Sequence, residues 1–385
     1  MKSQTILKAF RFSALAGLVM SANVMAVTGG GQTPEEKQAE LQASCDASSM
    51  LSVSSNPAES GPWVVGSRTI TIDGLTTEVF YPAVSGSQYG QPLKSWDVRQ
   101  FLPDSEAAKL PDEVSFRECE TCYADLPIDT QHGPYPVIIY VHGTASTRIA
   151  SLAFFEHWAS RGFVVLSADN PYIYQKDAME STAGILLADQ TGDTLDLIEE
   201  IRRPSYFGQA AFLRGNVDSN RIGLAGHSAG GFAIRNLGDE AGVRVLMPMA
   251  SGGTNEGSDL ISTMILGGLE DTTASFSLTT SAYEDSPVKK RLAGFANMGH
   301  VGFVDVCRGV ELRQQYGLEI PDAMQQLLDD GCGEGYVEPE AGWTMINYLS
   351  TAGFEETLKC DANSANKINQ FQSIFGTQNV LYQEF

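Results

Sequence analysis

The stretch "IGLAGHSAGGFAIRN" at residues 222–236 places a serine between two glycines, where an apolar run gives way to a helical pattern. The serine is Ser228, and Gly226 and Gly230 lie two residues to either side of it. Glycines at these places let a strand and a helix approach closely, while the serine occupies a tight and strained corner. Because 38 of the 385 residues are glycine, the motif can also arise by chance, and its context must decide.

Strand-like and helix-like segments alternate on both sides of this corner. Apolar runs typical of buried strands lie at 135–142, 163–169, 221–226, 243–250, 262–268 and within 289–297. Helical spacing lies between them, at 150–162, 191–203 and 228–238. Upstream, the strand-like segments 68–72 and 77–82 flank Asp73-Gly74, a strong hairpin signal. We expect an α/β fold with a mainly parallel central sheet, helices on both faces and antiparallel strands at its N-terminal side.

The first residues resemble an export signal. Basic residues lead into an apolar run from Phe12 to Met20, and small residues precede a cleavage site after Ala26. We interpret residues 1–26 as a signal peptide. A membrane anchor is the alternative, but it requires about 18 to 20 apolar residues. A lipoprotein anchor is not expected, since no cysteine follows the cut.

The remainder divides into an extended N-terminal segment, 27–62, and one large domain, 63–385. Within that domain, residues 83–134 are rich in turns, and we expect them to wrap the surface. Cleavage after Ala26 would remove three basic and no acidic residues, so the formal charge would change from −22 to −25. Such a chain repels phosphates, which argues against nucleic acid as a partner. The oligomeric state is not predicted.

All six cysteines follow the predicted signal, and an even number in an exported chain indicates up to three disulfides. We favour three pairings among the possible ones: Cys307 with Cys332, Cys119 with Cys122, and Cys45 with Cys360. The "CETC" motif at 119–122 could instead be a redox or zinc motif, but a second cysteine pair and a following βαβ pattern are missing.

A serine hydroxyl becomes a good nucleophile when a base accepts its proton. In hydrolases with a strand-corner-helix serine, the order along the chain is serine, acid, histidine. Only one histidine follows Ser228 in the sequence, His300 in the loop "FANMGHVGF", whereas His227 directly precedes the serine. We expect that neighbour, His227, to point away from the serine, and His142 to shape its own loop. We interpret the other two, His132 and His157, as surface or packing residues.

The acid that orients the histidine belongs in the loop after the preceding strand, where "MILGGLEDTTA" offers Glu270 and Asp271. We favour Asp271, and Glu270 remains an alternative. An oxyanion hole requires one backbone N–H after the nucleophile and one from the loop after the first central strand. Ala229 and Thr144 are the candidates, with Gly143 allowing close approach.

The motifs "HGTAST" (142–147), "GHSAGG" (226–231), "GGLEDT" (267–272) and "NMGHVGF" (297–303) resemble the α/β-hydrolase superfamily. Their order and spacing are similar to the bacterial branch of platelet-activating-factor acetylhydrolase-like, dienelactone-hydrolase-like and polyester-hydrolase-like serine esterases, which also includes chlorophyllases. The resemblance covers roughly residues 65–306, and residues 342–358 resemble the closing helix of that fold. Dienelactone hydrolase carries a cysteine nucleophile, and this chain departs from it at Ser228.

The resemblance implies a secreted or periplasmic serine carboxylesterase that acts through an acyl-enzyme, on a small-molecule or polymeric ester, without metal or organic cofactor. Polyester hydrolases of the cutinase type usually carry an aromatic residue at the Thr144 position, methionine at Ala229 and a tryptophan in the loop at 249–254. At these places this sequence has Thr144, Ala229 and "MASGGT", so a small or aliphatic acyl ester is favoured. The alternatives are a lipase or cutinase-like enzyme, a thioesterase or acyltransferase, and a catalytically silent binding protein of the same fold.

Residues 307–341 follow His300 directly, with Cys307 and Cys332 bracketing an amphipathic pattern. One interpretation is a surface helix that a disulfide stabilises. The other is a flap over the substrate pocket.

Overall fold

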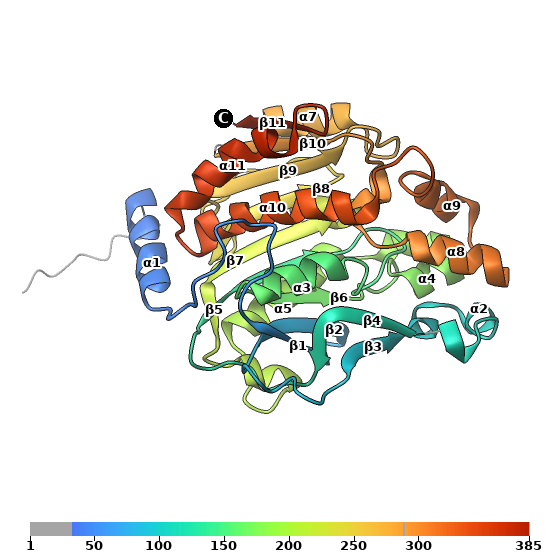
Figure 1. Ribbon diagram of the computed structural model, residues 1–385, viewed down its shortest axis with the longest axis horizontal. Coiled ribbons are helices and arrows are strands. Elements are labelled where there is room, and N and C mark those ends of the chain that lie inside the picture. Colours follow the sequence, from blue (N-terminus) through green and yellow to red (C-terminus); the bar gives the residue numbers. More distant parts are fainter. Residues whose placement is uncertain (1–32, 115, 288, 385) are drawn as a thin grey trace, which may run out of the picture.

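The computed structural model describes residues 33–114, 116–287 and 289–384. The predicted signal peptide, 1–26, lies outside these ranges. The described residues form one eleven-stranded sheet in the order β11-β10-β9-β8-β7-β5-β6-β2-β1-β4-β3 (Figure 1). The strands are β1 (Val64–Ile72), β2 (Leu75–Ala83), β3 (Leu93–Asp97), β4 (Phe116–Ala124), β5 (Tyr135–Val141), β6 (Val164–Ala168), β7 (Val217–His227), β8 (Val243–Met249), β9 (Ser262–Gly268), β10 (Lys290–Phe295) and β11 (Val380–Glu384).

Eleven α-helices accompany the sheet within the same residues. They are α1 (Pro34–Asp46), α2 (Asp104–Ala107), α3 (Leu152–Ser160), α4 (Gln175–Glu180), α5 (Gln190–Arg202), α6 (Ala229–Ile234), α7 (Phe276–Asp285), α8 (Cys307–Tyr316), α9 (Asp322–Asp329), α10 (Pro339–Leu358) and α11 (Ala362–Phe375). In Figure 1, α3, α10 and α11 lie over one face of the sheet, and α2, α4, α8 and α9 gather at one end of it.

The six central strands, from β10 to β6, run parallel, as the alternating pattern predicts. Both faces of strand β5 are covered by helices, which explains why its sequence is continuously apolar. Ile138 and Tyr140 pack into the core that α3 and α10 share, whereas Val137 and Ile139 pack into the core beneath α5. The α/β class and the parallel arrangement are therefore confirmed.

The N-terminal antiparallel strands are also confirmed. β1 and β2 pair from Val64 opposite Ala83 down to a tight turn at Asp73 and Gly74. Both turn residues have positive φ, at 45° and 88°, which is the requirement of a type I′ hairpin.

Three features differ from the sequence interpretation. The segment 27–62, expected to be extended, contains α1, which starts at a capping box between Thr33 and Glu36. Residues 83–134, expected to wrap the surface, contribute β3 and β4 to one edge of the sheet. Strand β11 was not predicted and pairs with β10 at the other edge. The edge strands were missed because they lack long apolar runs: in β4 the chain buries Cys119 and Cys122 and exposes polar residues between them.

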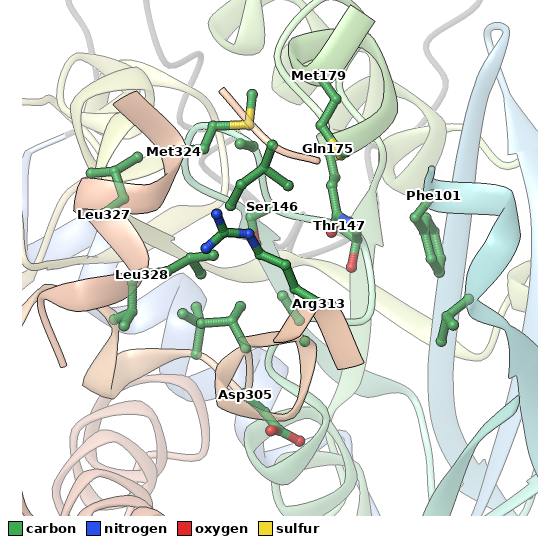
Figure 2. A pocket seen from close by; sticks show the side chains of 18 of the residues that line it. Phe101, Ser146, Thr147, Gln175, Met179, Asp305, Arg313, Met324, Leu327 and Leu328 are labelled. Carbon is green, nitrogen blue, oxygen red and sulfur yellow. The ribbon is translucent and has the colours of Figure 1, made fainter. Parts of the chain in front are cut away.

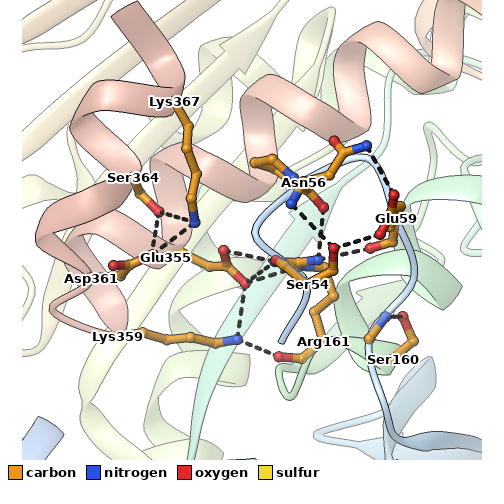
Figure 3. Close-up of polar contacts among 12 residues, drawn as sticks. Ser54, Asn56, Glu59, Ser160, Arg161, Glu355, Lys359, Asp361, Ser364 and Lys367 are labelled. Atoms are coloured by element: carbon orange, nitrogen blue, oxygen red, sulfur yellow. Dashed lines mark hydrogen bonds and ion pairs between the residues drawn. The ribbon is translucent and has the colours of Figure 1, made fainter. Parts of the chain in front are cut away.

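A buried arginine holds the N-terminal segment against the helical layer (Figure 3). Arg161, after α3, is fully buried and its guanidinium binds the carboxylate of Glu355 on α10, with N–O distances of 2.9 and 3.0 Å. The same guanidinium donates to three backbone oxygens of the N-terminal segment, those of Ser54, Asn56 and Glu59. This arrangement uses all five N–H donors of arginine and fastens residues 54–59 to the domain.

Three disulfides join the pairs that the sequence analysis favoured. Cys45 with Cys360 ties the end of α1 to the residue beyond α10, and Cys119 with Cys122 lies within β4. Cys307 with Cys332 brackets α8 and α9. Among the described helices, none combines the length and the apolar character needed to cross a membrane.

Candidate active site

Ser228 occupies the corner between β7 and α6. Its backbone has φ of 53° and ψ of −120°, a strained conformation for a residue with a side chain. The flanking glycines make this corner possible. A Cβ on Gly226 would lie 2.4 Å from the carbonyl oxygen of Gly230, and a Cβ on Gly230 would lie 2.0 Å from that of Val141. Helix α6 therefore approaches β7 and the end of β5 so closely that a side chain at either glycine would collide.

The three residues that the sequence analysis singled out as nucleophile, base and acid form one hydrogen-bonded chain. His300 Nε2 lies 2.8 Å from Ser228 Oγ, and His300 Nδ1 lies 3.0 Å from Asp271 Oδ2. Asp271 and His300 are buried, whereas Ser228 is partly accessible. The second oxygen of Asp271 accepts the N–H groups of Thr273 and Ala274, at 2.9 and 2.6 Å, which fixes the carboxylate in place.

Glu270, the alternative acid, is exposed, and its carboxylate is bonded to a residue other than His300. Its Oε2 accepts the backbone N–H of Met298 at 3.1 Å. The structure thus places Asp271, and not Glu270, against the imidazole of His300.

The two expected oxyanion donors are both free. In the residues that the structure describes, neither the Ala229 N–H nor the Thr144 N–H donates a hydrogen bond to another protein group. The loop after β5 lies directly against the serine, since a Cβ on Gly143 would lie 3.0 Å from Ser228 Cβ. Two free backbone donors beside a nucleophile can stabilise the negative charge of a tetrahedral intermediate.

The other histidines are held in structural contacts, with one difference from expectation. His227 was expected to point away from the serine, but it lines the same pocket, with its ring centroid 4.9 Å from that of His300. Its Nε2–H donates to the backbone oxygen of His300 at 2.9 Å, and burial lowers its pKa to about 3. His227 and His300 meet because folding brings the serine corner against the loop of His300, and the local sequence around His227 does not reveal this.

His142 shapes its own loop, as expected: it contacts the Gly143 oxygen through Nδ1 and the Asn170 N–H through Nε2. His132 binds Asp129, and His157 binds the backbone oxygen of Pro57.

A cavity of about 190 Å³ opens above Ser228, Thr144 and His300 (Figure 2). Its walls are largely apolar and come from segments far apart in the sequence. Met179 of α4 and Phe101, before α2, lie on one side in the figure, and Met324 and Leu328 of α9 lie on the other. The segment bracketed by Cys307 and Cys332 therefore forms one wall of the pocket.

Asp330 is a further residue of this site, and the sequence analysis did not single it out. One of its oxygens accepts the backbone N–H of His300 at 3.2 Å. The other accepts the backbone N–H and the hydroxyl of both Thr272 and Thr273, at 2.8 to 2.9 Å. Burial opposes ionisation of this carboxyl, but the hydrogen bonds from the two threonines prevail and lower its pKa.

Comparison with known proteins supports the fold. A scan against protein-family models found no match, and neither did a search of curated proteins. Among solved structures, a ferulic acid esterase from Streptomyces cinnamoneus matches with a TM-score of 0.58 and 17% sequence identity, over 86% of this chain and 98% of that one. The chain has the α/β-hydrolase fold. At this identity the likeness concerns the fold. Because 463 solved chains match, the fold alone does not identify a substrate.

Proposed function

We propose that this protein is an exported serine carboxylic-ester hydrolase that works through an acyl-enzyme. The proposal rests chiefly on the hydrogen-bonded chain from Ser228 through His300 to Asp271, located at an apolar pocket. A hydroxyl next to an imidazole that a buried carboxylate orients is the arrangement that acyl transfer requires.

In the first half of the reaction, Ser228 Oγ attacks the ester carbonyl while His300 Nε2 accepts the hydroxyl proton. The N–H groups of Thr144 and Ala229 stabilise the oxyanion, each by about 3 to 4 kcal/mol. His300 then gives its proton to the departing alcohol, which leaves an acyl group on Ser228. In the second half, His300 takes a proton from water, and the resulting attack releases the acid and restores the serine.

The lining of the pocket supports an aliphatic acyl group as the main recognition element. Each methylene moved from water into such a pocket contributes about 0.8 kcal/mol, or roughly a fourfold gain in kcat/KM. We propose that activity on p-nitrophenyl esters rises by this factor per methylene until the cavity is filled. An ester of an aromatic hydroxycinnamic acid belongs in the same panel, since the structural neighbour is named a ferulic acid esterase.

Export is the second part of the proposal. Three disulfides are typical of proteins that fold in an oxidising compartment, and the predicted signal peptide agrees with that location. The strongly acidic charge favours a small-molecule or polymeric ester over nucleic acid as partner.

The decisive experiment combines a fluorophosphonate probe with ester hydrolysis. Wild-type protein should be labelled and should hydrolyse p-nitrophenyl butyrate. Ser228→Ala should lose the label and several orders of magnitude in kcat, whereas Ser277→Ala, at an exposed serine on α7, should behave as wild type. Absence of labelling and turnover in the wild type would identify a silent binding protein instead. Faster transfer to an added alcohol than to water would identify an acyltransferase.

A further inference from the structure

The apolar pocket contains a cation without a counter-ion. Three side chains with a formal charge line it among the described residues, namely Arg117, Asp305 and Arg313. Figure 2 shows the Arg313 side chain extending from α8 into the middle of the pocket, between Leu328 and Ser146. The carboxylate of Asp305 is turned away from it in this view.

Asp305 is already neutralised by the other arginine. It forms an ion pair with the guanidinium of Arg117, which also donates to the backbone oxygen of Asp305 at 3.1 Å. Glu106, between the pocket residues Leu102 and Leu110, is likewise engaged, by Lys109 at 2.9 Å. No described group forms a hydrogen bond or ion pair with the guanidinium of Arg313. This is notable in a chain with 47 acidic and 25 basic residues.

The position of Arg313 in the last turn of α8 offers an ordinary explanation, because cations there are favoured by the helix dipole. Such a side chain gains most by staying in water, where its charge is solvated. Arg313 is instead partly buried among apolar side chains, so its guanidinium gives up part of its hydration and has no protein partner in its place. A ligand that brings its own anion into the pocket would supply the missing partner.

The guanidinium fork matches a carboxylate in a two-point contact. One uncompensated positive charge balances a singly charged carboxylate, whereas a phosphate would bring more negative charge than the pocket can neutralise. We propose that Arg313 binds a free carboxylate at the far end of the acyl chain, so that the preferred substrates are monoesters of dicarboxylic acids. This inference rests on the proposed esterase function and specifies its substrate class.

The test compares p-nitrophenyl monoesters of linear diacids, from adipic to sebacic acid, with the methyl p-nitrophenyl diesters of the same acids. Shorter diacids are left out because their carboxylate attacks its own ester. At the best chain length, wild-type kcat/KM should favour the free acid by about tenfold or more, the effect of a hydrogen bond to a charged group. Arg313→Gln should abolish that preference, because the ratio of free-acid to diester kcat/KM should fall by about tenfold when the charge-assisted contact is lost.

Two controls isolate the local contact from the general charge of the protein. Arg203→Gln removes an exposed arginine and should retain the wild-type preference. Arg313→Lys keeps the charge without the fork and should retain part of it. Equal kcat/KM of the wild type on the monoesters and the diesters would overturn the proposal. So would a fall in kcat/KM of the same size on both series in Arg313→Gln.

A binding measurement separates this inference from the esterase proposal. Calorimetry of Ser228→Ala protein with monomethyl sebacate requires no turnover. Tighter binding with Arg313 than with Gln at that position would support the carboxylate contact even if wild-type protein proved inactive. Equal affinity of the two proteins would overturn it even if the esterase proposal were correct.

Discussion

Asp330 accepts the backbone N–H of His300, so the segment that carries α8 and α9 is bonded to the loop of the proposed catalytic base. Through its other oxygen, the same carboxylate holds Thr272 and Thr273, the residues directly after Asp271. One buried side chain therefore links the acid loop, the histidine loop and the pocket wall. Its effect on the chemistry is indirect, since Asp330 contacts backbone and threonine groups and not the imidazole.

Asp330→Asn should lower kcat by about 100-fold and leave KM nearly unchanged, because a small displacement of His300 and Asp271 disrupts their alignment with the serine. Asparagine keeps the shape but replaces one accepting oxygen with a donor, so either the His300 N–H or the threonine N–H groups lose their acceptor. Steady-state kinetics on a butyrate ester measure the effect. Asp329→Asn, at the exposed neighbouring position, is the matched control and should retain wild-type kcat. Equal kcat values for the two variants would refute the positioning role.

The Cys307 to Cys332 disulfide closes a loop with a sequence separation of 25, which predicts about 3.5 kcal/mol of stabilisation. Replacing both cysteines with serine should loosen the pocket wall, so that turnover and acyl-chain preference change together. The pair Cys119 and Cys122, with a separation of 3, is the control and lies outside the pocket lining. If the variant melts at a lower temperature but keeps the wild-type chain-length profile, the segment is a stabilised surface element and not a flap.

Gly230→Ala should destabilise the protein by about 3 kcal/mol, because the added Cβ would lie 2.0 Å from the Val141 oxygen in β5, a central strand paired with β6 and β7. Gly309→Ala provides the contrast. That glycine lies within α8 with no atom near the new Cβ, so alanine should stabilise the helix by about 0.5 to 1 kcal/mol. Urea unfolding of both variants measures the two shifts, and a Gly230→Ala midpoint equal to wild type would contradict the steric argument.

Acid sensitivity should come in part from His157, far from the pocket. Burial lowers the pKa of His157 to about 4 from its ordinary value of 6.5. Below pH 6.5 the unfolded chain binds a proton that the folded chain resists, so this contribution to stability is complete above pH 6.5 and is lost as the pH falls to 4. The loss amounts to about 3 kcal/mol. His157→Gln should therefore show a shallower fall in unfolding free energy between pH 7 and pH 4.5 than wild type, and parallel curves would exclude this origin.

Much of the architecture was predictable because it depends on local chain properties. The apolar run of β5 requires cover on both faces, and Asp73-Gly74 adopts positive φ with little cost, so both predict their structures directly. The failures have two different origins. Strand β4 shows no apolar periodicity of its own and forms because β1 offers it a partner. Helix α1 carried a usable signal in its capping box, which the sequence interpretation overlooked.

For the candidate site, the sequence by itself determined the serine corner and the order of the candidate catalytic residues along the chain. The tertiary structure decided which carboxylate faces His300, that Asp330 links the two loops, and that Arg313 extends into the pocket without a partner. The physical reason is the range of the interactions. Turn geometry and glycine sterics act between residues close in the chain, whereas these contacts join side chains that folding brings together from distant segments.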